Sequence, residues 1–338
     1  MHPEMPNEKE NILLIAPTYF YFAEAIKVEM ERRGYSVIAY SDRPSNNKFI
    51  KSLIRINRKL AVPTTSAYIT KILASVSSLE LSKVIVILGQ AFTPKMIQRL
   101  KNAHQEAEFV YYIWDPVEHH PYSPKLFDLF DRAYTFEKKD LVRSPKLQFI
   151  NNFFVDDYRE LSHQRVPQKY KYSYIGTAYP TKVDGITKLR EHLPDHLGDS
   201  FLYLYLPSKN LRRVFSCKNK GYSKGLSSIG IHYQPLPKQE VLKVFNETEI
   251  ILDFPREAQE GLTMRTLDCQ AAKKKLITTN PDIVNYDFYN PQNIYYFDGE
   301  HIDLDNVFFK EKDFVPVPEE ILEKYSIRSF VSILLGGN

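Results

Sequence analysis

Apolar runs of strand length alternate with helical patterns through the first half of the chain. The first run is Asn11–Ala16, and residues 17–20 then turn into a helical pattern that reaches about Arg33. Gly34 caps that helix, and residues 35–40 form the second apolar run. Further runs of the same kind occupy residues 84–88, 109–113 and 133–136. Apolar strands joined through helices predict βαβ units and a parallel sheet.

The same alternation begins again in the second half of the chain. Strand-length runs occur there at residues 172–175, 201–206, 250–254 and 275–279. Between the two series, residues 156–168 are polar and have no apolar period, so they predict a linker. We therefore expect an α/β protein with two Rossmann-like domains, over residues 1–155 and 169–315. Residues 316–338 follow a Pro-rich connector and predict a terminal helix, broken near Tyr325.

Composition supports this organisation and excludes several protein classes. The chain has 338 residues, 43% of them hydrophobic and 25% charged, which is typical of a globular protein of two domains. It offers no run of ~20 apolar residues and no signal peptide, so we expect a cytoplasmic protein. Cys217 and Cys269 lie far apart, which argues against disulfides or a zinc site. A net charge of +4 is too small to indicate nucleic acid as a partner.

Two stretches of the chain are strongly basic. The one that begins at Lys48 and ends at Leu60 has apolar residues at helical spacing and five basic residues around them. Such a helix either packs on its domain or lies on an anionic membrane surface, so this stretch is a candidate for peripheral membrane contact. Residues 218–230 are basic and rich in Gly and Ser, which predicts a loop.

The most informative stretch lies between the apolar runs at residues 250–254 and 275–279. A helix is expected from about Gly261 to Lys274, after a loop that contains Pro255. The start of a helix between two parallel strands has unpaired N–H groups and partial positive charge, which favour an anion such as a diphosphate. Glu260 precedes this helix and Asp268 lies two turns further along it, roughly on the same side.

A polar loop follows the apolar run at residues 109–113. Its proton-handling side chains are Asp115, Glu118, His119 and His120. Residues at the carboxyl end of a parallel strand commonly belong to a site. We expect Asp115 and His119 to face a bound substrate; the alternative is a rigid, solvated loop.

The stretch around Glu260 resembles the donor-binding motif of the GT-B glycosyltransferases, in which seven residues separate two acidic ones near a Gly-containing helix start. Two positions depart from that motif. Asp268 replaces the usual glutamate, and Lys273-Lys274-Lys275 replaces a Gly-x-Pro segment. The opening of the second domain with Tyr174-Ile-Gly-Thr177 is similar to that of bacterial enzymes for surface-polysaccharide synthesis and of spore-maturation-like glycosyltransferases.

The resemblance implies two Rossmann-like domains facing across a cleft, with the terminal helix crossing back to the first domain. It also implies a transferase that moves a sugar from a nucleotide-activated donor, with a UDP-sugar expected, to a glycan or lipid-linked acceptor. No cofactor and no metal ion are expected, and retention of configuration is favoured over inversion. The alternatives are an inactive sugar-nucleotide-binding protein of the same shape and a nucleotide-sugar epimerase.

The same resemblance suggests a role for each residue of the site. Glu260 or Gln259 would hold the donor sugar, and Asp268 the ribose. A basic residue would stabilise the diphosphate in place of a metal, with Arg265 or Arg256 as candidates. The remaining donor-binding candidates come from the two helix starts and are Gly176, Thr177, Lys182, Gly261, Leu262 and Thr263. Asp115 or His119 would supply the base in an inverting reaction.

Overall fold

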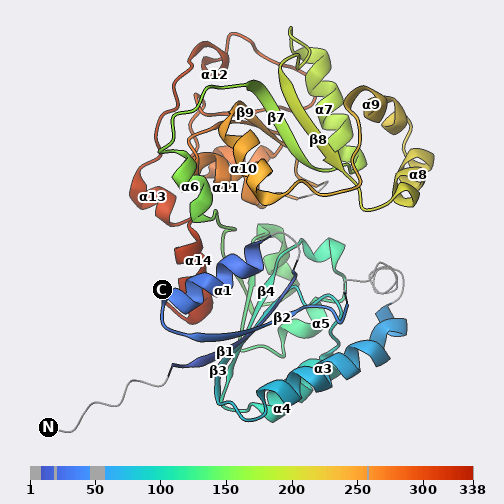
Figure 1. Cartoon of the computed structure of the whole chain (residues 1–338), viewed down its shortest axis with the longest axis vertical. Coiled ribbons are helices and arrows are strands. Elements are labelled where there is room, and N and C mark those ends of the chain that lie inside the picture. Colours follow the sequence, from blue (N-terminus) through green and yellow to red (C-terminus); the bar gives the residue numbers. More distant parts are fainter. Residues whose placement is uncertain (1–8, 19–20, 46–57, 257–258, 338) are drawn as a thin grey trace, which may run out of the picture. The chain divides into compact units, whose positions relative to one another are not determined.

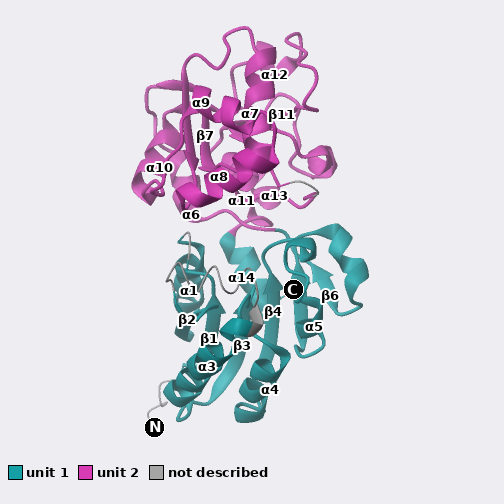
Figure 2. Ribbon diagram, turned by 90° about the vertical axis from the view of Figure 1, so that its right-hand side faces the viewer, with its two compact units in different colours: residues 1–151, 327–338 teal, residues 152–326 magenta. Residues whose placement is uncertain are grey.

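The computed structural model describes residues 9–18, 21–45, 58–256 and 259–337 (Figure 1). The chain divides into two compact units, which Figure 2 shows in different colours. Unit 1 combines residues 1–151 with residues 327–338, and unit 2 is residues 152–326. Most of the stretch from Lys48 to Leu60 lies outside the described residues; only its end belongs to a short 3-10 helix, Arg58–Ala61.

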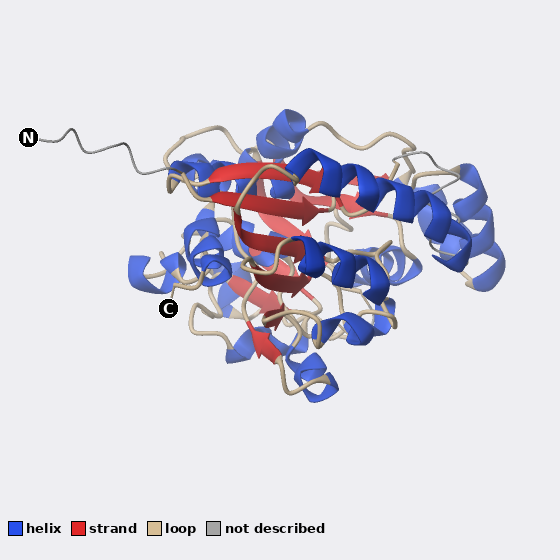
Figure 3. Cartoon of the chain, turned by 90° about the horizontal axis from the view of Figure 1, so that it is seen from below, coloured by secondary structure: helices blue, strands red, loops and turns tan. Residues whose placement is uncertain are grey.

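Unit 1 is built on a parallel sheet with the strand order β2-β1-β3-β4-β5-β6. Its strands are β1 (Asn11–Ala16), β2 (Ser36–Ser41), β3 (Leu81–Ile87), β4 (Glu108–Ile113), β5 (Arg132–Thr135) and β6 (Leu147–Phe149). The apolar runs become the central strands because both faces of the sheet are covered by helices, and residues 109–113 are completely buried. In Figure 3 these strands, in red, lie side by side with helices outside them.

Among the described residues, the α-helices of unit 1 range from four to fifteen residues in length. They are α1 (Phe22–Arg32), α3 (Val62–Val76), α4 (Pro94–Ala103), α5 (Pro124–Phe127) and α14 (Ile327–Leu335), with 3-10 turns at Val117–His119 and Lys138–Arg143. The longest, α3, is absent from the sequence-based expectation. It buries Ile69, Ile72 and Val76 at spacings of three and four, a helical pattern that its β-branched residues obscure.

Unit 2 has a second parallel sheet, in the order β11-β10-β9-β7-β8. Its strands are β7 (Tyr170–Thr177), β8 (Ser200–Tyr205), β9 (Thr248–Asp253), β10 (Lys275–Thr278) and β11 (Ile294–Tyr296). Its helices are α6 (Asp156–Leu161), α7 (Pro180–His192), α8 (Lys209–Lys218), α9 (Tyr222–Ile229), α10 (Lys238–Asn246), α11 (Met264–Ala271), α12 (Val307–Lys310) and α13 (Glu319–Glu323), with a 3-10 turn at Pro281–Asn285. A Cβ on Gly185 of α7 would lie 2.6 Å from the Phe254 ring, so only glycine lets this helix pack closely on the sheet.

Three expectations about local structure in unit 2 are wrong. Residues 156–168 are not simply a linker, because α6 forms there by burying Tyr158 and Leu161 three residues apart. Residues 218–230 are not a loop, because Tyr222, Gly225 and Leu226 form the buried side of α9. The helix expected over residues 261–274 is shorter, because Thr263 caps it and Ala272 ends it.

The terminal segment consists of two helices, α13 and α14, with a break between them that includes Tyr325, as the sequence predicts. α13 belongs to unit 2, whereas α14 belongs to unit 1. There Phe330 meets the ring of Tyr112 at a centroid distance of 5.0 Å. The Arg132 guanidinium donates to the carbonyl oxygens of Ile333 at 2.7 Å and Leu334 at 3.0 Å. α14 is therefore an integral part of the unit 1 core.

Lys273 occupies the position where the resembled motif has glycine, and its φ of 54° is in the left-handed region. Its side chain is exposed, so replacing it removes no buried contact. Because glycine adopts this conformation without a steric penalty, Lys273→Gly is expected to raise the free energy of unfolding by about 1 kcal/mol. Chemical denaturation measures the change. Lys273→Ala keeps the Cβ and serves as the control; an equal gain in Lys273→Ala would show that charge, and not backbone conformation, is responsible.

Candidate functional site

The strand order of unit 2 predicts a ligand-binding crevice at the carboxyl ends of β7 and β9, where the order of the strands reverses. β7 pairs with β8 on one side and with β9 on the other, and the helices that follow β7 and β9 leave on opposite faces of a sheet with this order. The ends of these two strands bring together Gly176 and Thr177 of β7, Asp253 of β9, and the starts of α7 and α11. The sequence-predicted donor-binding residues belong to the end of β7, to the segment between β9 and α11, and to α7 and α11 themselves.

Asp253 organises the start of α11. Its carboxylate is 1% exposed and accepts hydrogen bonds from the hydroxyls of Thr263 at 2.5 Å and Thr266 at 3.1 Å. The Arg265 guanidinium donates to its other oxygen at 3.0 Å. The Thr263 hydroxyl in turn accepts from the Thr266 N–H, which makes it the N-cap of the helix. In the sequence, Asp253 is visible only as part of a buried strand. A carboxylate at the end of such a strand, followed by a helix start that contains Thr and Arg, could nevertheless have indicated its role.

Arg265 joins this helix start to the neighbouring strand. Its second guanidinium nitrogen donates to the carbonyl oxygen of Ile175 in β7, and the guanidinium carbon lies 5.0 Å from the centre of the Tyr174 ring. Its side chain is 22% exposed. Because Asp253 already neutralises much of its charge, Arg265 positions the two strand ends and is a weaker candidate for holding a diphosphate than the sequence alone indicates.

The loop before α11 is held through its backbone. Asn280 donates from its side-chain amide to the carbonyl oxygen of Glu260 at 2.9 Å, and buried Asn152 donates likewise to Leu262 at 2.9 Å. The side-chain amide of Gln259 donates to the carbonyl oxygen of Gly261 at 3.1 Å. The backbone of residues 260–262 is therefore held by hydrogen bonds, and Glu260 is an exposed residue of this segment.

Arg256 connects the two loops of the crevice. Its guanidinium carbon lies 5.2 Å from the centre of the Tyr179 ring, directly before the first residue of α7. Lys182 lies in the first turn of α7, and that turn contains no acidic residue. One basic residue of the loop after β9 and one of the first turn of α7 thus belong to the same edge of the sheet. This is the arrangement that a diphosphate needs.

Asp268 lies deeper than the sequence suggested. It is 4% exposed, and its Oδ1 atom has no hydrogen-bond partner among the described residues. Burial raises the pKa of this carboxyl well above its ordinary value, and the nearby Arg265 charge only partly opposes the rise. A buried acceptor oxygen without a donor is costly in the protein alone, and a ligand hydroxyl would satisfy it.

Polar residues also lie at the carboxyl edge of the unit 1 sheet. Asp115 follows β4 and lies 2.9 Å from the Nε2 atom of His120, whereas His119 is exposed on the adjacent 3-10 turn. Asp42, which follows β2, is completely buried and accepts from the side chain of Arg43 at 3.2 Å. His120 also interacts electrostatically with Asp42. The histidine that the structure associates with Asp115 is therefore His120, and adjacency in sequence could not distinguish it from His119.

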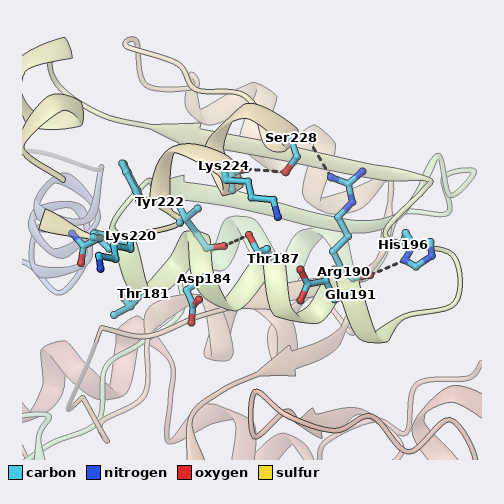
Figure 4. A pocket seen from close by; sticks show the side chains of 15 residues that line it. Thr181, Asp184, Thr187, Arg190, Glu191, His196, Lys220, Tyr222, Lys224 and Ser228 are labelled. Carbon is cyan, nitrogen blue, oxygen red and sulfur yellow. Dashed lines mark hydrogen bonds between the residues drawn. The ribbon is translucent and has the colours of Figure 1, made fainter. Parts of the chain in front are cut away.

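A groove elsewhere in unit 2 does not coincide with the crevice. It has a volume of about 670 Å³ and lies between α7 and the segment that leads into α9, where Figure 4 shows Arg190, Lys220 and Lys224 among its lining side chains. Its walls also contain Asp184 and Glu191.

Among the described residues, no group of three or more His, Cys, Asp or Glu side chains could hold a metal ion. No helix in the described parts of the chain is long and apolar enough to cross a bilayer.

No family model and no curated protein match this chain. Solved structures do resemble it. HepE from Anabaena, in complex with UDP and glucose, is 10% identical, with a TM-score of 0.53 over 96% of this chain and 95% of that chain. WaaG, a glycosyltransferase involved in lipopolysaccharide biosynthesis, is 12% identical, with a TM-score of 0.56 over 97% and 100% of the two chains. The α,α-trehalose 6-phosphate synthase from Burkholderia multivorans is 8% identical, with a TM-score of 0.61 over 97% and 96%. These are GT-B glycosyltransferases, and the GT-B fold expected for this chain is confirmed.

Proposed function

We propose that this chain is a glycosyltransferase that moves a sugar from a nucleotide-activated donor to a glycan or lipid-linked acceptor. The observation that supports this best is the crevice of unit 2, where the Asp253 network fixes the start of α11 and Arg256 lies beside the start of α7. The UDP bound in the HepE structure and the lipopolysaccharide role of WaaG are compatible with a nucleotide-sugar donor and a cell-surface acceptor.

In this proposal the crevice binds the donor through fixed positive groups. The N–H groups at the start of α11 and the side chains of Arg256 and Lys182 stabilise the diphosphate as it leaves, without a metal ion. Glu260, which is exposed just before α11, contacts the donor sugar. Asp268 accepts a hydrogen bond from a ribose hydroxyl, which would occupy its unpartnered oxygen.

The reaction is proposed to retain the configuration of the transferred sugar, as the two-acid motif implies. Asp115 and His120, which lies 2.9 Å from it, would then contact the acceptor. In an inverting enzyme Asp115 would be the base. A UDP-sugar is the proposed donor, and surface-polysaccharide synthesis at the inner face of the membrane is the proposed setting.

Nucleotide-dependent thermal stabilisation tests the donor site. The expected result is that one nucleotide of the set UDP, GDP, ADP and CMP, with its sugar conjugates, stabilises the chain by about 2.7 kcal/mol at a hundredfold excess over its Kd. Glu260→Ala should weaken the response to the sugar conjugate, and Asp268→Asn the response to the nucleotide itself. Glu300→Ala, at an exposed position of unit 2, is the matched control.

Activity separates the proposed transferase from the two alternatives. Incubation with the stabilising sugar-nucleotide should release the free nucleotide, slowly with water and faster with an acceptor glycan. Binding without any release would identify an inactive binding protein, and conversion to an epimeric sugar-nucleotide would identify an epimerase. If none of these nucleotides stabilises the folded chain, the proposal is contradicted.

A further inference from the structure

Six basic residues form an exposed surface on α8, the segment that follows it and the first turn of α9. They are Lys209, Arg212, Arg213, Lys218, Lys220 and Lys224, and we call them the α8–α9 basic surface. The chain contains no Asp or Glu between Asp199 and Glu240, so the local charge of this segment is entirely positive. In Figure 1, α8 and α9 lie beside each other at the β8 side of unit 2.

No ion pair compensates these charges within the described part of the chain. Other basic residues of the protein are paired, such as Lys83 with Glu108 at 2.5 Å and Arg159 with Glu323 at 2.8 Å. Asp184 and Glu191 on α7 line the groove of Figure 4 together with Lys220 and Lys224, and Asp184 already pairs with Lys188. The four basic residues of α8 are not among the residues that line this groove.

The packing of α8 determines which of its faces is available. Leu211 and Phe215, four residues apart, pack against the core of unit 2. The Phe215 ring also meets the rings of Tyr179 and Tyr222 at 5.7 and 5.8 Å. The opposite face therefore presents Arg212 and Arg213. Val214, which is 46% exposed, lies between this face and the inward-facing residues. A fixed helix with basic residues and an exposed apolar side chain is thus available for a partner.

We propose that the α8–α9 basic surface docks unit 2 onto an anionic lipid bilayer. Six cations spread over sixteen residues exceed what one donor diphosphate could neutralise, and an extended anionic surface matches them better. Val214 supplies apolar area that enters the headgroup region while the arginines stay at the phosphate level. Because α8 directly follows β8, docking holds the carboxyl edge of the sheet, where the crevice lies, close to membrane-bound acceptors. This surface is separate from the stretch between Lys48 and Leu60, and it does not depend on the proposed chemistry.

Co-sedimentation of the full chain with vesicles tests the proposal. We expect binding to vesicles of phosphatidylcholine with 30% phosphatidylglycerol and none to phosphatidylcholine alone, with the binding weakening as salt is raised from about 50 to 300 mM. The triple variant Lys209→Glu, Arg212→Glu, Arg213→Glu should lower the partition coefficient about a hundredfold. The Lys209→Glu change lies in the first turn and suits the helix dipole, and the Ser208 cap is unchanged, so α8 should still form.

The control variant changes the net charge equally at exposed positions elsewhere: Lys71→Glu, Lys95→Glu, Lys312→Glu. It should retain most vesicle binding, and equal losses in both triple variants would overturn the proposal. Undiminished binding of the α8 variant would also overturn the proposal, because membrane contact would then lie elsewhere. Tighter binding of the chain to single-stranded DNA than to anionic vesicles at 150 mM salt would overturn it as well. Melting temperature and nucleotide stabilisation report folding and the donor site separately, so failure of this proposal is distinguishable from failure of the proposed function.

Discussion

Asp253→Ala should lower the free energy of unfolding by about 3 to 5 kcal/mol, because it leaves the Arg265 charge largely buried and without its carboxylate partner. The hydroxyls of Thr263 and Thr266 lose the same acceptor, so the start of α11 loses its fixed position. We expect the variant to lose nucleotide-dependent stabilisation as well, although Asp253 itself need not touch the ligand. Urea denaturation and the nucleotide panel measure the two effects.

Asp184→Ala is the matched control for this variant. Its carboxylate is exposed and pairs only with Lys188 one helical turn away, so the expected change is below 1 kcal/mol. Normal stability in Asp253→Ala would mean that the crevice does not depend on the carboxylate. A second variant, Arg265→Met in the Asp253→Ala background, should recover part of the lost stability because it removes the unpaired charge.

Deleting residues 327–338 should unfold unit 1. The deletion removes four buried side chains of α14, which are Ile327, Phe330, Val331 and Leu334. At about 1.5 to 3 kcal/mol each, their burial contributes roughly 6 to 12 kcal/mol as an upper estimate, which is comparable to the whole stability of a typical domain. The deletion also removes the two carbonyl oxygens that accept hydrogen bonds from Arg132.

Limited proteolysis followed by mass spectrometry locates the effect of the deletion. Cleavage should spread through residues 9–151, while residues 152–326 stay resistant and keep their response to nucleotide. Deleting only residues 337–338 is the control and should change little, since α14 ends at Leu335. Equal sensitivity of both units would show that the stability of unit 2 depends on α14.

The central strands and the architecture were predictable from the sequence because strands buried on both faces are continuous apolar runs. Residues 109–113 illustrate this: no polar residue interrupts them, and all are buried. Helices that bury few residues were less visible. α6 depends on Tyr158 and Leu161 alone, and α9 uses Gly225 to approach α7, where a Cβ would come within 2.7 Å of Val183. Such contacts exist only in the folded chain.

The candidate site was predictable in its location but not in its internal connections. The segment around Glu260 and Gly261 could be placed at a helix start, because strand, loop and helix follow one another in sequence. The link from Arg265 to Ile175 spans ninety residues and has no local signal. Whether a helical Asp faces solvent or the core depends on what covers the helix, so the burial of Asp268 could not be foreseen from its spacing to Glu260.

The placement of α14 also has a consequence for how the protein is made. Unit 1 contains the first residue of the chain and the last helix, whereas unit 2 is one continuous segment between them. Phe154 and Ser326, near the two ends of unit 2, pair in a parallel bridge, so the segment leaves and re-enters at one place. During translation unit 2 can complete its sheet while α14 is still inside the ribosome. The unit that emerges first is therefore the last to finish folding, and the apolar surface that α14 covers stays exposed until this helix has been synthesised.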